Sequence, residues 1–440
     1  MNILLIVLAS VAGLLVLLFA AVGVLYVTRG TPVRRVRAPG DAHGPPAVDD
    51  ATFPPTVELL TKTPLREGHQ VAVFGCGQEL YPHLYDDLRR ARRSITLQLY
   101  YCKPGRMADE FAEIMLERAA AGVRVLFLRD AFGSAPLPAE YLERLERGGV
   151  RIAVFRPTRP WELHKVQHRS HIRVVVVDGR VGYTGGFGID DKWFGDGRHP
   201  DQWRDTTTRF VGPAVLQHQA TFAAGWAEAT GELLAGADLF PLDEDGEAPA
   251  AARAGDGDAR AGLMHCAPTL GSTAAERFVA LTIAGARRRL WITNAYFVPD
   301  PHFCGLLADA ARRGVDVRVL TPGAGTDVAV TYWAGRSRWE GLLAAGVRLY
   351  EYRASMVHAK TITADGVWSS VGTNNFDNRS MAFNDESVLL VHDREVAERL
   401  EGLFSADLHW AEEVELAAFR RRPVTDRVRE QAARLVARVL

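Results

Sequence analysis

The sequence predicts an α/β protein built from two similar lobes. In residues 69–234 and again in 263–422, apolar runs of four to seven residues rich in Val, Ile and Leu alternate with stretches of helical spacing such as residues 108–122. This alternation is typical of a β-sheet flanked by helices. The two regions also repeat each other, which indicates an internal duplication. We therefore expect two lobes, each with a mixed sheet and flanking helices.

The repeat is visible in three pairs of segments, at offsets between 192 and 197 residues. The pairs are ARRSITLQLYY (91–101) with ARRRLWITNAYF (286–297), AAAGVRVLFLRD (119–130) with ARRGVDVRVLTP (311–322), and GGVRIAVFR (148–156) with AGVRLYEYR (345–353). The order of the pairs is the same in both regions, so a duplication explains them better than chance.

Residues 1–28 are predicted to form a transmembrane anchor. The 25 residues from Ile3 to Val27 are uncharged and nearly all apolar. As a helix they would be about 37 Å long at about 1.5 Å per residue, enough to cross a bilayer. A cleaved signal peptide is the alternative, but no Lys or Arg precedes the run and its apolar part is too long. The arginines that follow, from Arg29 onward, predict a single-pass cell-membrane protein with cytoplasmic lobes.

Three further segments lie outside the lobes. Residues 29–68 are rich in Pro, Gly and Ala and are predicted to be a tether. Residues 235–262 contain few bulky apolar residues and are predicted to be a linker. Residues 423–440 have helical spacing and several arginines. For this tail, a helix on the domain or membrane surface, core packing and a frayed end all remain open.

Composition excludes some classes of function. The chain has 52 Lys and Arg against 53 Asp and Glu, and it lacks the basic excess of a nucleic-acid binder. We therefore expect no nucleic-acid partner. The four cysteines are scattered, without a CxxC pair or histidines at metal-ligand spacing, and are interpreted as free thiols. We expect neither a metal site nor a cofactor.

The most informative motif lies in MVHAKTITADGVWSSVGTNNFDNRS (356–380). It contains His358, Lys360 and Asp365 at the spacing HxKxxxxD, followed by Thr373 and Asn375. Residues two apart on an extended segment project from one face. An imidazole and an ammonium on that face supply a nucleophile or proton donor beside a cation, as the reaction of a phosphodiester requires.

A weaker copy of this motif lies 187 residues earlier. It contains His171, Arg173 and Asp178 in HIRVVVVDGRVGYTGGFG. Arg173 occupies the position of the lysine, and Gly188 occupies the position of Asn375 in the second copy. Two half-sites in one chain predict phosphoryl transfer at a site shared between the lobes.

These motifs and their surroundings resemble the phospholipase D superfamily, and within it the bacterial cardiolipin synthases. The resemblance covers roughly residues 70–420. Its other matching features are FRP (155–157), Trp203-Arg204-Asp205-Thr206, Ala229-Thr230-Gly231-Glu232, NAYFVPD (294–300), FDNRS (376–380), Asn384 and Glu386. The chain departs from the family pattern at Arg173, where the family has lysine, and at Gly188, where asparagine is usual.

The resemblance implies the roles of the motif residues. In the family one motif histidine attacks phosphorus and the other transfers protons, and we assign these roles to His171 and His358 respectively. The sequence itself does not distinguish the two histidines. Lys360 and Arg173 would hold the phosphoryl oxygens, because both carry positive charge. We expect Thr373 and Asn375 to donate hydrogen bonds to the same oxygens.

The family also places a carboxylate downstream of each histidine to orient its imidazole. We expect Glu386 to orient His358 and Asp205 to orient His171. The motif aspartates, Asp178 and Asp365, complete the catalytic motifs but are expected to support strands and loops rather than to react.

The function that the resemblance implies is a membrane-anchored phosphatidyltransferase of the cardiolipin synthase type. It would join two phosphatidylglycerols into cardiolipin and glycerol through a phosphohistidine. A phospholipase D-like hydrolase is the first alternative, since only the acceptor differs. A non-catalytic lipid-binding or scaffold protein is the second, because Arg173 and Gly188 alter the first motif. The expected partners are a phospholipid substrate and the membrane.

Overall fold

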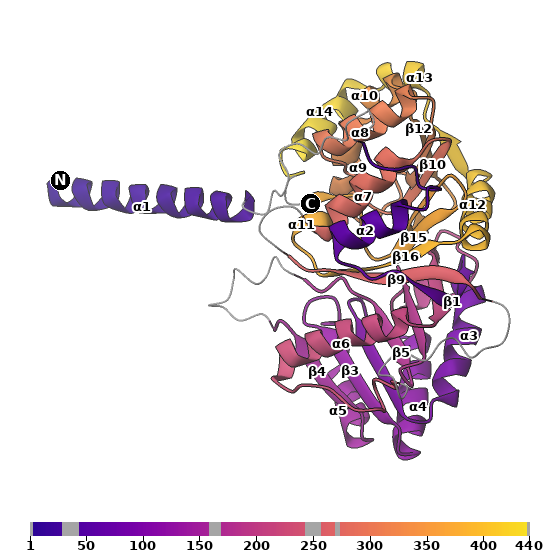
Figure 1. The fold of residues 1–440 in the computed structure, drawn as a ribbon. Helices are drawn as coiled ribbons and strands as arrows, with labels where there is room; N and C mark the ends of the chain where they lie inside the picture. The colour runs from indigo at the N-terminus through magenta and orange to yellow at the C-terminus, as the bar shows by residue number, and fades with distance from the viewer. Residues whose placement is uncertain (1–2, 29–43, 158–168, 243–256, 269–272, 438–440) are drawn as a thin grey trace.

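The computed structural model describes residues 3–28, 44–157, 169–242, 257–268 and 273–437. Residues 29–43 of the predicted tether and residues 243–256 of the predicted linker lie outside the described residues. The described chain is a mixed α/β protein, as the sequence predicts (Figure 1). Its strands form one sheet of 15 strands and a separate pair, β13 with β7.

The first half of the fold follows the N-terminal helix α1 (Ile3–Thr28). Its elements are α2 (Phe53–Thr61), β1 (Arg66–Phe74), α3 (Gly77–Arg90), β2 (Ser94–Leu99), α4 (Arg106–Ala120), β3 (Arg124–Asp130), α5 (Ala139–Arg147), β4 (Arg151–Phe155), β5 (Val174–Val177), β6 (Val181–Gly185), the short 3₁₀ helix η2 (Asp191–Trp193), β7 (Trp203–Arg204), β8 (Thr207–Val211) and α6 (Ala214–Thr230).

The second half has a similar succession of elements. They are β9 (Ala259–Cys266), α7 (Ala274–Gly285), β10 (Arg289–Asn294), α8 (Pro301–Arg312), β11 (Asp316–Pro322), α9 (Ala329–Arg336), α10 (Trp339–Ala344), β12 (Arg348–Tyr352), β13 (Met356–Val357), β14 (Lys360–Ala364), β15 (Trp368–Gly372), α11 (Asn378–Ala382), β16 (Glu386–His392), α12 (Arg394–Leu408), β17 (Ala411–Glu413), α13 (Leu416–Arg420) and α14 (Val424–Arg434).

The two halves have the same strand order. It is β4-β3-β2-β5-β6-β8-β1 in the first half and β12-β11-β10-β14-β15-β16-β9 in the second. In each half the first three strands pair in parallel and the others pair antiparallel. The antiparallel pair β1–β9 joins the halves, with His69 opposite Ala259. Instead of two separate sheets, one continuous sheet therefore runs through both halves.

Helices cover both faces of the sheet because its strands are apolar on both faces. Along β3, Val125 and Phe127 pack with α3 and α4 on one face. The intervening Leu126 and Leu128 pack with Phe222 of α6 on the other face. Successive strand residues point to opposite faces, so an uninterrupted apolar run requires cover on each side.

Part of the predicted tether is folded against the second half. Helix α2 packs on α7, and Val48 and Phe53 are fully buried. The ring of Phe53 stands edge-on to Trp368, with centroids 5.2 Å apart. At the other end of the chain, α14 packs against α9, and its buried Glu430 pairs with Arg422. Among the alternatives for the C-terminal tail, the structure therefore favours packing on the domain.

Helix α1 stands apart from the other elements in Figure 1. Its described side chains are exposed and include Leu14, Leu17 and Phe19. No helix within the described ranges is long and apolar enough to cross a membrane. The anchor over residues 1–28 therefore stays a prediction.

Candidate active site

The two histidine motifs meet where the halves of the fold contact each other. His171 precedes β5 and His358 precedes β14, the matching strand of the second half. The backbone N–H of His171 donates to the carbonyl of Asp385 at 2.9 Å, and that of His358 donates to Arg204 at 2.6 Å. Each histidine is therefore held by backbone of the opposite half.

Both motifs face a cavity of about 390 Å³. His171 and Arg173 come to its lining from the first half, and His358 and Asn375 come from the second. A cavity of this size accommodates a phosphate and a small head group, while longer parts of a ligand would extend out of it. Residues of both halves therefore line one cavity, as expected for a shared site.

Glu386 orients His171. The Nδ1 atom of His171 lies 3.0 Å from Oε2 of Glu386 and 3.0 Å from the carbonyl oxygen of Thr373. Glu386 is fully buried, and its other oxygen accepts from the Asn384 amide at 3.4 Å. The predicted pairing of Glu386 with His358 was therefore wrong.

Asp205 orients His358 in the corresponding way. The Nδ1 atom of His358 lies 2.8 Å from Oδ2 of Asp205, and the same oxygen accepts from the Trp193 indole at 2.9 Å. The predicted pairing of Asp205 with His171 was also wrong. The pairs are exchanged because each histidine lies just before its strand, at the contact with the opposite half, and contacts the acid of that half.

The residues after each motif strand contribute to these carboxylate sites. Gly186 leaves room for Asp205, since a Cβ atom at this position would lie 2.1 Å from Oδ1 of the carboxylate. At the matching position in the second half, the Thr373 hydroxyl donates to Glu386. Thr373 is fully buried and does not line the cavity. It therefore supports Glu386, and this differs from the predicted role of donating to a phosphoryl oxygen.

Burial of both imidazoles favours their neutral forms. Burial lowers the pKa of His358 well below its ordinary value, and the Lys360 ammonium lowers it further. Burial also lowers the pKa of His171, with a smaller contribution from Arg173. Burial raises the pKa of Asp205, but the His358 imidazole and Lys360 outweigh it, so the pKa is lowered overall. A neutral imidazole beside a carboxylate can act as nucleophile or base and is stabilised once it becomes charged.

Lys360 lies beside the reactive nitrogen of His358. Its Nζ is 2.8 Å from Nε2 of His358, and the side chain is 3% exposed. Burial lowers the pKa of Lys360 to about 7, with a further lowering from Arg173. A phosphoryl oxygen that bound at Nε2 would therefore arrive next to this ammonium.

Arg173 occupies the matching position but is held by the backbone. Its Nε donates to the carbonyl of Phe187 at 2.6 Å, and one terminal nitrogen donates to the carbonyl of His171 at 2.9 Å. The residue is 1% exposed and lines the cavity. It brings positive charge to the first half-site while also supporting the chain on either side of the motif.

Gly188 leaves no space for the missing asparagine. A Cβ atom at this position would lie 2.8 Å from the carbonyl oxygen of Tyr101 and 3.0 Å from the Trp193 ring. The ring of Trp193 and the backbone of Tyr101 thus occupy the space that a side chain at this position would need. The first half-site has exchanged an amide for an aromatic ring whose N–H holds Asp205.

The motif aspartates lie away from the cavity. Asp178 accepts from the backbone N–H groups at the start of β2 (Arg92, Arg93 and Ser94). Asp365 accepts in the same way at the start of β10 (Arg287, Arg288 and Arg289). Both have positive φ, 55° and 54°. This agrees with the structural role predicted for them, and neither belongs with the catalytic groups.

Several residues that line the cavity were not predicted. They are Tyr100, Tyr101, Phe132, Gly133, Pro136, Arg169, Trp193, Trp203, Tyr296, Asp327, Val328, Thr331, Asp377, Arg379, Ser380 and Asn384. Eight of them stand within segments or at positions already noted in the sequence: Tyr100 and Tyr101 in the repeat segment 91–101, Trp203 beside Asp205, Tyr296 in NAYFVPD, Asp377, Arg379 and Ser380 in FDNRS, and Asn384. Asp327 lies in a glycine-rich segment without any recognised motif, so no sequence signal indicated it.

Comparisons with known proteins show that the chain is similar to cardiolipin synthases. The family model described as "Cardiolipin synthase, PLD-like domain" matches residues 279–408. A cardiolipin synthase of Geobacillus thermodenitrificans is 32% identical over 381 residues, which cover 86% of this chain and 74% of that protein. Cardiolipin synthase A of Pseudomonas syringae pv. syringae is 32% identical over 384 residues, which cover 87% and 77% of the two chains.

Solved structures with little sequence identity share the fold. The phosphatidylserine synthase of Haemophilus influenzae superposes with a TM-score of 0.65 at 14% identity and covers 88% of this chain and 99% of its own. The polyphosphate kinase of Porphyromonas gingivalis reaches a TM-score of 0.52 at 13% identity and covers 83% and 52% of the two chains. At such identities the likeness concerns the fold alone.

Proposed function

Because the chain belongs to the cardiolipin synthase family of phospholipase D-type phosphatidyltransferases, we propose that it joins two phosphatidylglycerols into cardiolipin and glycerol at the shared cavity. The observation that carries the proposal is the pair of imidazole–carboxylate contacts, His171 with Glu386 and His358 with Asp205, on one cavity. Two oriented imidazoles beside buried cations supply a nucleophile, a proton carrier and charge neutralisation for a phosphodiester.

In the first half-reaction, His171 attacks the phosphorus of one phosphatidylglycerol. A P–N bond forms and the P–O bond to the head-group glycerol breaks, while His358 gives a proton to the departing oxygen. His358 must enter this step protonated, and the Asp205 carboxylate stabilises that charged form. The products are free glycerol, a phosphatidyl-His171 and a neutral His358.

In the second half-reaction, a head-group hydroxyl of another phosphatidylglycerol attacks the phosphohistidine. His358 takes the proton of this hydroxyl, an O–P bond forms and the P–N bond breaks. Cardiolipin leaves and both imidazoles return to their starting states. Water in place of the second lipid would give phosphatidic acid, so transfer requires the bound lipid to keep water from the phosphohistidine.

The cations of the two motifs neutralise the phosphoryl group during both steps. Lys360 stands at the reactive nitrogen of His358, and Arg173 supplies charge on the other side. The buried Asn375 also lines the cavity and completes the proposed set of phosphoryl contacts. Such preorganised groups act strongly because little water competes with them.

The roles of the two histidines rest on the family resemblance, and a trapping experiment tests them. Enzyme mixed briefly with phosphatidylglycerol labelled in its phosphate is quenched in base, which preserves phosphohistidine, and the labelled peptide is sequenced. Label on the peptide of His171 supports the assignment. Label on the peptide of His358 reverses the two roles.

We also propose that the two halves arose by duplication, as the repeated segments indicate. The same strand order and pairing directions in both halves support this proposal. For the domain boundaries we keep lobes at residues 69–234 and 263–422 with a linker at 235–262. Helix α2 packs on the second half. We therefore propose that the tether comprises only the residues between the anchor and this folded segment.

The proposed location is the cell membrane, with residues 1–28 as a single-pass anchor and the catalytic halves in the cytoplasm. The uncharged run from Ile3 to Val27 and the arginines after it support this arrangement. Removal of residues 1–28 should release the protein from washed membranes while its thermal unfolding is unchanged. A truncated protein that resists carbonate extraction would contradict a single anchor.

Lipid analysis tests the proposed activity directly. Purified full-length protein in detergent is incubated with phosphatidylglycerol, and the products are separated and quantified. Cardiolipin with an equal amount of glycerol supports the proposal. Phosphatidic acid with glycerol would indicate a hydrolase, and unchanged substrate would indicate a lipid-binding protein. His358→Ala is the matched inactive control.

A further inference from the structure

The cavity contains a carboxylate that the proposed chemistry does not use. Asp327 lies just before α9, is exposed and lines the cavity. A phosphodiester lipid is an anion, so a carboxylate in its binding site opposes binding through charge repulsion. Because this repulsion weakens lipid binding, we expect the carboxylate to make a favourable contact with another part of the ligand.

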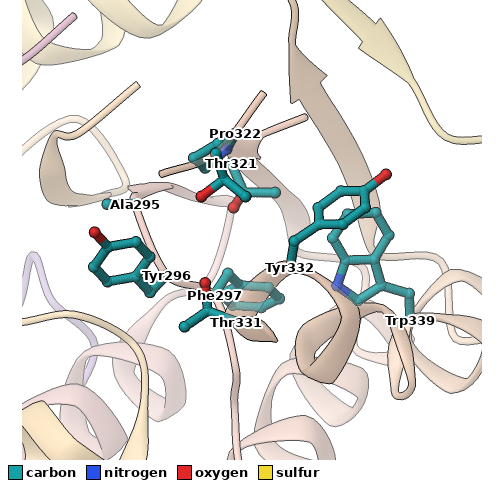
Figure 2. Close-up of a pocket in the computed structure, with 9 residues that line it drawn as sticks. Ala295, Tyr296, Phe297, Thr321, Pro322, Thr331, Tyr332 and Trp339 are labelled. Carbon is teal, nitrogen blue, oxygen red and sulfur yellow. The ribbon is translucent and has the colours of Figure 1, made fainter. Parts of the chain in front are cut away.

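Tyr296 holds this carboxylate in place. The Tyr296 hydroxyl donates to Asp327, 2.9 Å from Oδ1 and 3.0 Å from Oδ2. In Figure 2 this hydroxyl points away from the side chains of Tyr332 and Trp339. The ring of Tyr296 stands edge-on to His358, with ring centroids 6.3 Å apart. Asp327 is therefore oriented on the side of the cavity where His358 lies.

A second polar group on the same cavity lacks a partner. Ser380 of α11 lines the cavity and is 1% exposed, and its hydroxyl has no hydrogen-bond partner among the described residues. Buried polar atoms in folded proteins nearly always have a partner. A hydroxyl-bearing ligand in the cavity would supply one, because a serine hydroxyl both donates and accepts.

We propose that Asp327, Tyr296 and Ser380 form a subsite for the hydroxyl groups of a glycerol head group. The inference rests on the proposed function, in which glycerol leaves in the first half-reaction and a glycerol head group enters in the second. A carboxylate accepts hydrogen bonds from alcohol hydroxyls strongly, since charge-assisted bonds are shorter and stronger than neutral ones. Because both alcohols are glycerols, one subsite beside His358 serves both steps.

The direction in which one substitution changes KM distinguishes this subsite from simple charge repulsion. Asp327→Asn removes the charge while keeping the shape. If Asp327 only repels anions, KM should fall for every anionic phospholipid. If it binds hydroxyls, KM for phosphatidylglycerol should rise about tenfold or more, as expected from a lost hydrogen bond to a charged group. KM for phosphatidylethanol, whose head group has no free hydroxyl, should stay the same or fall.

Substitution of the other two subsite residues, Tyr296 and Ser380, should raise KM for phosphatidylglycerol by smaller factors. Tyr296→Phe and Ser380→Ala should each raise KM for phosphatidylglycerol roughly three- to tenfold and leave phosphatidylethanol unaffected. Ser380→Ala removes an unpartnered hydroxyl, so its thermal stability should not decrease. The control is Asp309→Asn, an exposed position on α8 outside the cavity, which should change neither KM.

The lipids are compared with identical acyl chains in neutral detergent micelles. Methanol in fixed excess serves as the acceptor for both donors, because phosphatidylethanol has no hydroxyl of its own to take the phosphatidyl group. Initial consumption of each donor is followed. A change of KM in Asp327→Asn that is equal for phosphatidylglycerol and phosphatidylethanol would overturn the subsite. A second result would also overturn it: wild-type protein consumes phosphatidylethanolamine efficiently, and Asp327→Asn is the one variant that loses this activity. Such a result would indicate a site for the ammonium group. A wild-type protein that makes no cardiolipin contradicts the proposed function itself, before any variant is compared.

Discussion

The carboxylate of Glu386 lies 3.0 Å from Nδ1 of His171 although 215 residues separate them in the chain. Asp205 makes the reciprocal contact with His358 across the halves at 2.8 Å. Neither histidine is oriented within its own half, so each half-site is complete only when the halves are docked. Because of this exchange, the two histidine–carboxylate pairs form only when the halves are held together, as they are by the β1–β9 pair and the contacts between the halves.

The exchanged pairs predict which histidine each acid controls. Glu386 raises the pKa of His171 against the lowering effect of burial. Glu386→Gln should therefore lower the pKa of His171 further and leave that of His358 unchanged. Asp205→Asn should lower the pKa of His358 and leave that of His171 unchanged. Histidine-selective NMR titration of the two variants measures both values. A shift at the other histidine would contradict the exchanged pairing.

Activity should follow the same pairing. The amide variants keep the shape of each side chain but lose the charge that stabilises an imidazolium, so each should reduce turnover about a hundredfold or more. Ser369→Ala, a buried position in β15 outside the cavity, serves as the control. Turnover within threefold of wild type in Glu386→Gln would show that the contact is not used in catalysis.

The second prediction concerns pH. The pKa of Lys360 lies at about 7, so its ammonium is present below this pH and is lost as the pH rises through it. The phosphodiester stays anionic over this range, and kcat/KM should therefore fall above about pH 7. In Lys360→Arg the cation persists, and this alkaline decline should disappear even if the overall rate is lower. A decline at the same pH in Lys360→Arg would assign it to another group.

Much of this arrangement could be predicted from the sequence, because local patterns determine it. The apolar runs of β3 and β11 indicate strands covered on both faces, and the repeated motifs indicate a site shared by two halves. The pairing of acids with histidines could not be predicted, since it depends on how the halves dock. A single sequence contains no period or spacing that reports contacts such as Glu386 with His171.

The same limit applies to Asp327 and to the packed part of the tether. Asp327 reaches the cavity because of where the loop before α9 lies. The glycine-rich sequence of this loop does not predict that position. Helix α2 has two prolines near its start, and in the sequence they resembled a linker. Pro is favourable in the first turn of a helix, where its missing N–H has no partner to lose.

The third prediction concerns access of lipid to the cavity. Phe132 lines the cavity, yet 64% of it is exposed, and an apolar ring in this position can contact acyl chains at a membrane surface. Phe132→Ser should reduce activity on phosphatidylglycerol vesicles about tenfold, from the apolar contact it loses, and should leave activity on a soluble short-chain substrate unchanged. Leu233→Ser, exposed outside the cavity, is the control. Equal losses on both substrates would place Phe132 in the chemistry or the fold instead.

The last prediction separates the two roles of Arg173. Its guanidinium donates to two backbone carbonyls, those of Phe187 and His171, and also brings charge to the cavity. Arg173→Ala leaves both buried carbonyls without these donors and should lower the free energy of unfolding by about 3 kcal/mol. Arg173→Lys keeps the charge and can satisfy one carbonyl, so it should retain more stability and more activity than the alanine variant. Urea unfolding and initial rates on phosphatidylglycerol measure the two effects separately. Wild-type activity in a correctly folded Arg173→Ala protein would show that the first half-site needs no cation, and that Lys360 alone neutralises the phosphoryl group.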